Sequence, residues 1–168
     1  MARSGRTRGS SMIEFLLVGI PLIFLLISTF EVARGMWSYH TLAYGVKEGT
    51  RYASVHGQTC GTSPNTCTVT VGDVVQKVLD SCSGLLSSQM NLTLVSGGGS
   101  TTCNPASSCV GNGTVWPAAP ANALGNNIEI DATYPFQSAI SMFWPGAGSG
   151  MQAAMVTFHA SSQETMQN

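Results

Sequence analysis

The apolar positions of this chain are concentrated in one continuous run near its N-terminus. Residues 15–27, FLLVGIPLIFLLI, form thirteen positions without a polar side chain, between Glu14 and Ser28. Thirteen apolar residues suit the central region of a secretory signal, whereas a membrane span needs ~20 residues, or ~17 at the short end. The wider window 12–30 offers nineteen positions, so it is long enough to cross a bilayer, but it contains Glu14.

Glu14 is the one charged residue in this window. A carboxylate costs roughly 2.5–3.5 kcal/mol at the centre of a bilayer and less near an end. Glu14 lies near the end of the window, and we expect it in the first turn of the helix, where the helix dipole favours an anion. Pro21 removes one backbone hydrogen bond, which a membrane helix accommodates as a kink. The window therefore remains compatible with a transmembrane helix.

Beyond residue 30 the apolar positions change to a helical period. They recur at alternating steps of three and four, and no proline interrupts residues 31–56. We predict one long helix from Met12 to about His56, half in lipid and half outside, with a stripe that packs on the rest of the domain: Met36, Tyr39, Ala43, Val46, Thr50 and Ala53. Glycines at 35, 45 and 49 each lower helix propensity by ~1 kcal/mol, which suggests the close approach of another element.

The remainder alternates between short periodic segments and turns. Asp73, with Gln76 three residues on, offers a capping-box variant for a second helix that ends near Leu86. Strands are predicted at 91–95, at 128–134 and at 151–159, the second from the alternation of Ile128, Ile130, Ala132 and Tyr134 with polar residues. Residues 96–127 are rich in Gly, Pro, Ser and Asn and predict a long surface loop. These elements indicate an α+β fold with a sheet of about three antiparallel strands.

Charge is scarce in this chain and unevenly placed. Charged residues make up 9% of the sequence, against about 25% in a typical soluble domain. Ser, Thr, Asn and Gln together number 51 of the 168 residues, so hydroxyls and amides supply the polar surface. A net charge of −1 argues against a nucleic-acid-binding protein. Arg3, Arg6 and Arg8 directly precede the apolar run, and a basic segment before an apolar run is typical of an exported or membrane protein.

Two kinds of processing are compatible with this N-terminus. Ordinary signal peptidase needs small residues after the apolar run, and the sequence Ala33-Arg34-Gly35 is a poor site because of its charges. The segment Gly9-Ser10-Ser11-Met12-Ile13-Glu14-Phe15 instead resembles the prepilin peptidase signal. That resemblance implies cleavage between Gly9 and Ser10, with Glu14 fifth and Phe15 sixth in the mature chain. The membrane helix would then be retained.

In the pilins that this motif resembles, the glutamate contacts the N-terminal amine of a neighbouring subunit and sets the axial register. A charge placed next to hydrocarbon needs such a partner. The alternative is that Glu14 only caps the helix, although Ser10 or Ser11 could do so without a full charge.

A second resemblance is narrower. The segment Lys47 to Gly57, KEGTRYASVHG, resembles the REGARYAAVHG stretch of TadE-like proteins, and Glu31-Val32-Ala33-Arg34 resembles their EFGR motif. Asp131 to Phe136 resembles their V-x-Y-P-F strand end. Departures from the family pattern include Val32, Ala33 and Lys47. TadE-like proteins are small pilin-like components of the tight-adherence (Flp, type IVc) pilus. The resemblance covers residues 8–57 and carries over the motif residues Glu31, Arg34, Glu48, Gly49, Arg51 and Tyr52. Glu31 with Arg34 and Glu48 with Arg51 are i,i+3 pairs that support a helix.

Five cysteines in an exported chain suggest disulfides. The spacing favours two short loops, Cys60 with Cys67 and Cys103 with Cys109, although four cysteines allow three connectivities. Cys82 is left over and falls on the buried face of the second predicted helix. A metal site is disfavoured because there is no CxxC motif and only His56 lies near Cys60. We expect no metal and no cofactor.

Nothing in the sequence predicts catalysis. The glycines at 146, 148 and 150 lack dinucleotide-binding spacing and indicate a turn. His40, His56 and His159 lie far apart, and no nucleophile motif is present. Trp116 and Trp144 are candidate contact residues, with burial in a small core as the alternative. We therefore expect a protein that is not an enzyme.

The resemblance implies a minor pilin or pseudopilin of a tight-adherence pilus. It predicts a cytoplasmic leader at 1–9, a membrane-spanning half-helix at 10–30, an exported half-helix at 31–57 and an extracytoplasmic pilin-like globule at 58–168, in the bacterial inner membrane or in the pilus. Implied partners are prepilin peptidase, other pilin and pseudopilin subunits, the inner-membrane assembly platform and lipid, without nucleic acid or a small-molecule substrate. Alternatives are a type II secretion pseudopilin and a tethered or secreted envelope protein that binds a ligand.

Overall fold

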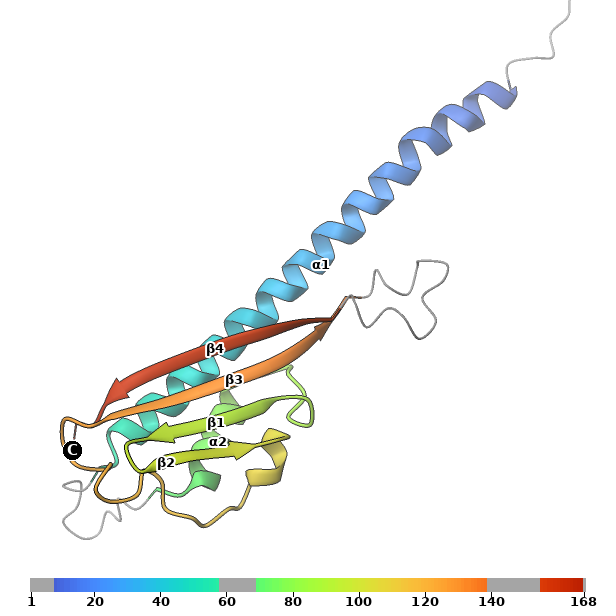
Figure 1. The fold of residues 1–168 in the computed structure, drawn as a ribbon. Coiled ribbons are helices and arrows are strands. Elements are labelled where there is room, and N and C mark those ends of the chain that lie inside the picture. Colours follow the sequence, from blue (N-terminus) through green and yellow to red (C-terminus); the bar gives the residue numbers. More distant parts are fainter. Residues whose placement is uncertain (1–7, 58–68, 139–154, 168) are drawn as a thin grey trace, which may run out of the picture. The chain divides into compact units, whose positions relative to one another are not determined.

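The computed structural model describes residues 8–57, 69–138 and 155–167 (Figure 1). It divides into two compact units, which we describe separately. Of the described residues, the first comprises 8–36 and Ser138, and the second comprises 37–57, 69–137 and 155–167. In the first unit the described residues are almost entirely helical.

Helix α1 comprises Arg8–Ser54 and includes Pro21. The long N-terminal helix predicted from the sequence is therefore confirmed, and it ends within two residues of the predicted position. Its start is earlier than predicted, at Arg8 instead of Met12. Consequently Glu14 does not lie in the first turn, as we had expected from the apolar window alone.

The second unit contains one four-stranded antiparallel sheet, in the order β2-β1-β3-β4. Its strands are β1 (Asn91–Ser96), β2 (Gly99–Cys103), β3 (Asn127–Gln137) and β4 (Met155–Thr165). The predictions at 91–95 and 128–134 are confirmed as β1 and β3. The last strand was predicted at 151–159 but runs to Thr165; residues 151–154 lie outside the described residues.

Strand β2 corrects the prediction of a continuous loop at 96–127. The first residues of that segment form a hairpin, in which Ser96 pairs with Gly99 across the two residues Gly97 and Gly98. Gly99 has a φ of +136°, which a residue with a side chain rarely adopts. After β2 comes the short 3-10 helix η1 (Ala106–Cys109), and the following described residues up to β3 are irregular apart from a single bridge between Thr70 and Val115.

Helix α2 comprises Val71–Ser81, and its boundaries also differ from the prediction. The N-cap is Thr70, and Asp73 is the third helical residue of a capping box. Asp73 is therefore the third helical residue of a capping box with Thr70, and not the N-cap of a box with Gln76 as predicted. The helix ends five residues before Leu86, where the backbone N–H of Cys82 bonds back to Val78 and Leu79 and Gly84 adopts a φ of +87°.

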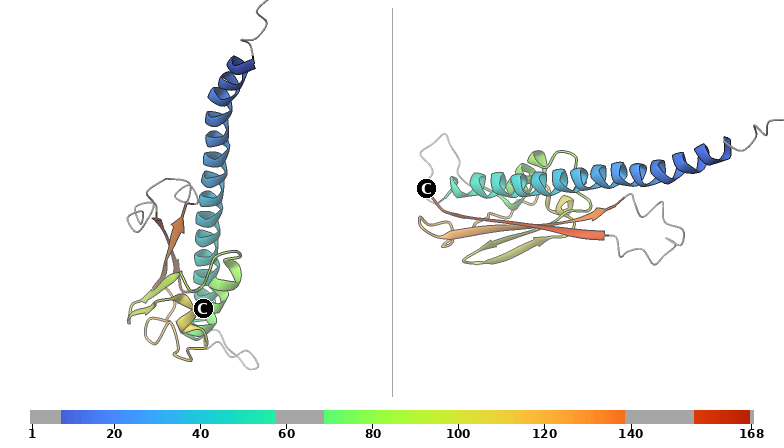
Figure 2. Two further views of the ribbon diagram at one scale, coloured as in Figure 1. Left: turned by 90° about the vertical axis from the view of Figure 1, so that its right-hand side faces the viewer. Right: turned by 90° about the horizontal axis from the view of Figure 1, so that it is seen from above.

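The two helices of the second unit lie on one face of the sheet (Figure 2). Between them and the sheet is a core in which the largest fully buried side chains are apolar. They include Leu42 and Val46 from α1, the four valines of α2, and Leu92, Leu94, Ile128 and Ile130 from the sheet. The predicted stripe on α1 is right at Val46, Thr50 and Ala53. It is wrong at Met36 and Tyr39, which are 56% and 44% exposed.

Two surfaces of the second unit face away from this core. Along α1, opposite its buried side, is a surface that we call the outer helix face, formed by Trp37, His40, Tyr44, Lys47 and Arg51, all exposed. On the sheet, the residues that alternate with buried ones form the outer sheet face, which no described helix covers. Its members are Asn91, Thr93, Glu129, Asp131, Thr133, His159, Ser161 and Gln163.

Candidate functional site: the N-terminal helix

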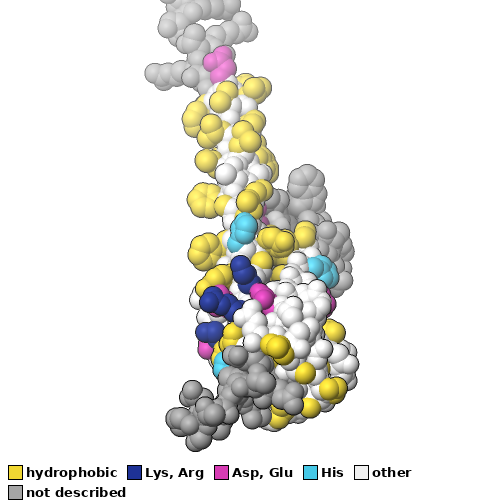
Figure 3. Space-filling model, turned by 90° about the vertical axis from the view of Figure 1, so that its left-hand side faces the viewer, with side chains coloured by type: hydrophobic (Ala, Val, Ile, Leu, Met, Phe, Trp, Pro, Cys, Tyr) yellow, Lys and Arg dark blue, Asp and Glu magenta, His cyan; other side chains and the backbone are white. Residues whose placement is uncertain are grey.

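The first half of α1 is apolar and exposed on all sides. Between residues 12 and 30 every large hydrophobic side chain except Ile27 is more than half exposed, and hydrophobic atoms cover this part of the helix in Figure 3. Nineteen helical residues span about 28 Å, close to the ~30 Å of a bilayer's hydrocarbon core. This is a candidate membrane span by length and composition. Water is a poor solvent for such a surface, so the helix requires lipid or other helices around it.

Polar groups in this stretch are few, and Thr29 bonds within the helix. The Thr29 hydroxyl donates to the backbone carbonyl of Leu25 at 2.8 Å. Such a back-bond satisfies a hydroxyl where no water is available.

The residues of the processing motif lie inside the helix. The backbone of Gly9 and Ser10 is helical, and the side chains of Glu14 and Phe15 are exposed. Phe15 is 76% exposed, as one of the apolar side chains that cover this end of the helix. Glu14 therefore stands on the surface of the apolar segment, where a neighbouring chain can reach it.

Glu31 and Arg34 mark the end of the apolar segment. Their side chains form the predicted i,i+3 ion pair, with 3.2 Å between Arg34 Nη2 and Glu31 Oε2. Arg34 is 50% exposed and Glu31 is 13% exposed. A single i,i+3 pair within a helix contributes only ~0.2–0.5 kcal/mol, so its importance is positional: it places charge immediately after the apolar segment.

In its second half α1 is held against α2 by glycines. A Cβ atom added to Gly45 would lie 2.2 Å from Cys82 Sγ, and one added to Gly49 would lie 2.3 Å from Val78 Cγ2. Both distances are far below van der Waals contact, so the two helices meet where α1 has no side chain. This confirms that a close approach explains these glycines and gives Gly49 of the family motif a packing role.

The other motif residues take separate places on α1. The Tyr52 ring packs on the His56 ring at 4.5 Å between centroids, and His56 Nδ1 lies 2.6 Å from the Tyr52 carbonyl oxygen. Glu48 and Arg51, both in the described part of the chain, do not form the ion pair that their i,i+3 spacing predicted. Arg51 is instead exposed on the outer helix face.

Strand β4 contacts the C-terminal end of α1. Thr50 is fully buried, and its hydroxyl lies 2.8 Å from the Val46 carbonyl and 3.4 Å from the Ser162 carbonyl. Beyond β4, the backbone N–H of Gln167 donates to the Ser54 carbonyl at 3.0 Å. The last residues of the chain are thereby connected to the last turn of its first helix, a contact that the sequence pattern did not reveal.

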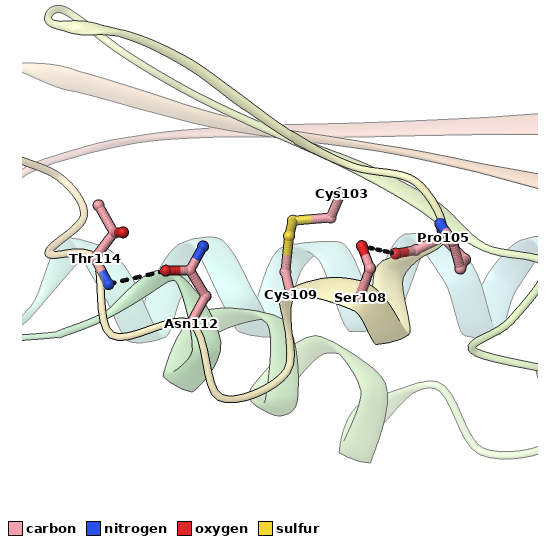
Figure 4. Close-up of a disulfide and its surroundings, with 6 residues drawn as sticks. All are labelled: Cys103, Pro105, Ser108, Cys109, Asn112 and Thr114. Carbon is pink, nitrogen blue, oxygen red and sulfur yellow. Dashed lines mark hydrogen bonds between the residues drawn. A yellow bond between two sulfur atoms is a disulfide. The ribbon is translucent and has the colours of Figure 1, made fainter.

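One of the two predicted disulfides is present in the described residues. Cys103 and Cys109 are joined, with 5.6 Å between their Cα atoms, and connect β2 to η1 (Figure 4). Within the same segment the Ser108 hydroxyl donates to the Pro105 carbonyl, and the Thr114 N–H donates to the Asn112 side chain. Cys60 and Cys67 lie outside the described residues, so their pairing remains a prediction.

Cys82 is a free, buried thiol, as its position on the helix predicted. Burial raises its pKa from 9.0 to about 11. Its Sγ atom lies 3.7 Å from the Thr41 carbonyl and fills the space next to Gly45. Because it is protonated and shielded at neutral pH, Cys82 acts as a small apolar side chain.

The remaining candidates do not come together as a reaction centre. His40 is exposed on α1, His56 packs on Tyr52, and His159 lies on the outer sheet face. Trp116 is 4% exposed, so it fills the core instead of offering a contact surface. Trp144 and the glycines at 146–150 lie outside the described residues.

Comparison with known proteins gives one match. Residues 9–51 match the model of a family described as TadE-like protein, which is about a quarter of the chain. No curated protein and no solved structure matches the chain significantly. The match covers nearly all of α1, from the glycine of the processing motif to Arg51, and confirms the resemblance predicted from these residues.

Proposed function

We propose a role in pilus assembly for this chain, which is TadE-like over its N-terminal helix and is thereby a protein associated with the tight-adherence pilus. Its specific role is that of a minor pilin or pseudopilin. Prepilin peptidase cuts it after Gly9, and the assembly platform of the inner membrane brings it into the pilus or alongside it. The globule lies outside the cytoplasm, because the arginines of the leader keep residues 1–9 inside.

The observation that carries this proposal is the combination of the family match with the apolar, exposed segment of α1 at residues 12–30, which follows Gly9 closely in the sequence. A chain of this kind works by association. Before assembly the exposed side chains of residues 12–30 contact lipid, and after assembly they contact the helices of neighbouring subunits. Helix packing of this type depends on shape and on polar pairs, since lipid is as apolar as the helices themselves.

Glu14 supplies the polar pair in this proposal. Cleavage after Gly9 creates a new amine at Ser10, and an exposed carboxylate five residues into the mature chain can meet such an amine on a neighbouring subunit. A charge pair surrounded by hydrocarbon is strongly favoured over either charge alone, so it fixes one register between two helices.

N-terminal sequencing of the mature protein tests the processing step. A start at Ser10 is expected, whereas a start at Met36 or beyond would show ordinary secretion and remove the membrane helix from the mature protein.

Replacing Glu14 by Ala tests the assembly step. We expect the variant to be cleaved and exported normally but to be depleted by at least tenfold from the sheared pilus fraction, because the register contact is lost. Asp80→Ala is the control, since it removes an exposed carboxylate from α2, outside the apolar segment. Unchanged recovery of Glu14→Ala in the pilus fraction would exclude Glu14 from assembly.

A further inference from the structure

The two outer faces of the second unit carry charges of opposite sign. The sheet carries no lysine or arginine, since every lysine and arginine of the chain lies at position 77 or before, and its outer face bears Glu129 and Asp131. The outer helix face bears Lys47 and Arg51, neither of which is in an ion pair within the described residues. Half-buried Glu48 lies beside them, so this part of the outer helix face has two positive charges and one negative charge. Figure 3 shows basic side chains gathered in one area.

The spacing of the two pairs matches. Lys47 and Arg51 are four residues apart on one side of a helix, which separates them by ~6 Å along its axis. Glu129 and Asp131 are two residues apart on one face of a strand, which separates them by ~7 Å. Two exposed cations can therefore lie opposite two carboxylates with both pairs in contact.

The two faces point in opposite directions within one copy. Glu129 and Asp131 alternate with Ile128, Ile130 and Ala132, which are buried under the helices. Lys47 and Arg51 project from the side of α1 opposite its buried side chains. The charges cannot meet within one molecule, but they can meet between two copies that stack in the same direction. Such a head-to-tail contact leaves one free face at each end and therefore continues into an open series.

We propose that the outer helix face of one copy docks on the outer sheet face of a second copy of this chain. Trp37 and Tyr44, 66% and 57% exposed, are the aromatic anchors of the contact, and Lys47 and Arg51 face Glu129 and Asp131. Around the carboxylates the sheet offers hydroxyls, among them Ser161, which donates to Glu129 Oε1 at 2.7 Å. This contact adds a partner to the proposed function. It depends on that function in one respect, namely that both copies are anchored in the same membrane.

The size of the contact explains why the membrane matters. Where all four strands pair, over about six residues at ~3.4 Å each and with ~4.8 Å between strands, the sheet presents a face of roughly 400 Å². That is about half of the ~800 Å² per partner in a stable interface. Copies free in solution would associate weakly, whereas copies tethered in one bilayer meet at a much higher effective concentration.

Zero-length crosslinking tests the contact directly. A carbodiimide joins an amine to a carboxylate only when the two touch, and the chain has two lysines, Lys47 and Lys77. In membranes that contain the full-length protein we expect a crosslink from Lys47 to Glu129 or Asp131, identified by mass spectrometry of a dimer band. Because the two faces point in opposite directions within one copy, Lys47 cannot reach these carboxylates in its own chain, so the crosslink must join two copies.

Charge reversal then shows whether the pairing holds the copies together. If Lys47 links to Glu129, the partner pair is Arg51 with Asp131, and the variants are R51E and D131K; if it links to Asp131, E129K replaces D131K. Each variant alone should lose crosslinking by roughly tenfold, because like charges then face each other. Co-expression of the two variants, or both changes in one chain, should restore it. K77E and D80K are the matched controls, since both positions are exposed on α2 away from the two faces.

Crosslinks from Lys47 to another protein instead of a second copy would overturn the proposal, as would unchanged crosslinking in R51E. Leader cleavage, measured on the same samples, separates this outcome from failure of the proposed function. A correctly cleaved wild-type chain without the Lys47 crosslink refutes only the docking contact.

Discussion

Gly49 and Val78 show how a single position can be determined by its neighbour on another element. Gly49 lies in the interior of α1, where Ala is normally better by ~1 kcal/mol. In this protein a Cβ atom at position 49 would lie 2.3 Å from Cγ2 of Val78, a residue of α2 that is fully buried against α1 and the sheet. The contact between the helices therefore outweighs the helix propensity of alanine at this position.

Replacing Gly49 by Ala should therefore destabilise the protein, by about 1–3 kcal/mol as for other overpacked cores. Val78→Ala in the same chain removes the clashing methyl group, so the double variant should be more stable than the sum of the two single changes predicts, by ~0.5–3 kcal/mol. Denaturant unfolding of the full-length protein in detergent measures both. Gly19→Ala is the control, because its Cβ meets nothing closer than 3.9 Å. Strict additivity would contradict the close contact.

The Cys82 thiol links stability to pH on the alkaline side. Burial raises its pKa from 9.0 to about 11, so between these values the unfolded chain loses the proton while the folded chain keeps it. The free energy of unfolding should therefore fall as the pH rises from 9.0 to about 11. Unfolding curves at several pH values measure the slope, and Cys82→Ala should flatten it. Equal slopes for the two proteins would mean that this thiol is not protected by folding.

At the scale of elements, hydrogen bonds from its cap and from a segment distant in sequence determine where α2 begins. Thr70 Oγ1 accepts from the Asp73 N–H at 3.2 Å, and Asp73 Oδ2 accepts from the Thr70 N–H at 3.0 Å and from its hydroxyl at 2.6 Å. The first helical N–H groups, of Val71 and Gly72, donate to the carbonyls of Thr114 and Asn112. The helix therefore begins where the cap and the segment that follows the disulfide together satisfy its backbone.

Thr70→Ala should cost ~1 kcal/mol, the usual value for an N-cap. The hydrogen bonds from Thr70 lower the pKa of Asp73 below 3.8, so the capping contribution is complete above that pH and is lost as the pH falls through the lower, folded value. Thermal unfolding at pH 7 and pH 3 measures both effects. Ser81→Ala, at the other end of the helix, is the control. A Thr70→Ala protein with wild-type stability at pH 7 would show that the loop alone starts the helix.

The elements differ in how far the sequence could predict them, and the reasons are physical. The second half of helix α1 and strand β3 were predictable because burial on one side imposes a period on their apolar residues, and the first half of α1 because its apolar run is continuous. Strand β2, GSTTC, has one buried residue, Cys103, and its pairing depends on β1 instead of on a pattern of its own. The start of α2 was misplaced because Thr70 with Asp73 and Asp73 with Gln76 have the same spacing, and the bonds to Asn112 and Thr114 that decide between them are distant in sequence.

The candidate site was predicted better than its surroundings, but only in part. The apolar segment, the Glu31–Arg34 pair and the close approach at Gly45 and Gly49 follow from local sequence. The two outer faces do not, because each becomes visible only when the strands are placed in register and the buried side of α1 is known. The alternation of Glu129 and Asp131 with buried residues was the one available signal.

At the scale of the whole molecule, residues 12–30 determine where the chain resides. An arginine at position 22, in the middle of this window, should cost roughly 2.5–3.5 kcal/mol of insertion free energy. We expect Leu22→Arg to move a large part of the protein into the supernatant of an alkaline wash of membranes, while the wild type stays in the pellet. Val32→Arg, just beyond the window, is the control. Full retention of Leu22→Arg would mean that the apolar segment is not what holds the protein in the membrane.

The hydrogen bond between Gln167 and Ser54 has a consequence for the order of events during export. The end of α1 emerges early in translocation, but β4, which pairs along β3 and contacts the end of α1, lies about a hundred residues later in the chain. Until those residues cross the membrane, Leu42, Val46 and the valines of α2 lack part of the sheet that buries them. We therefore expect the unit to close only after β4 has crossed the membrane, so a partly exported subunit would still be unfolded and in need of protection on the far side of the membrane.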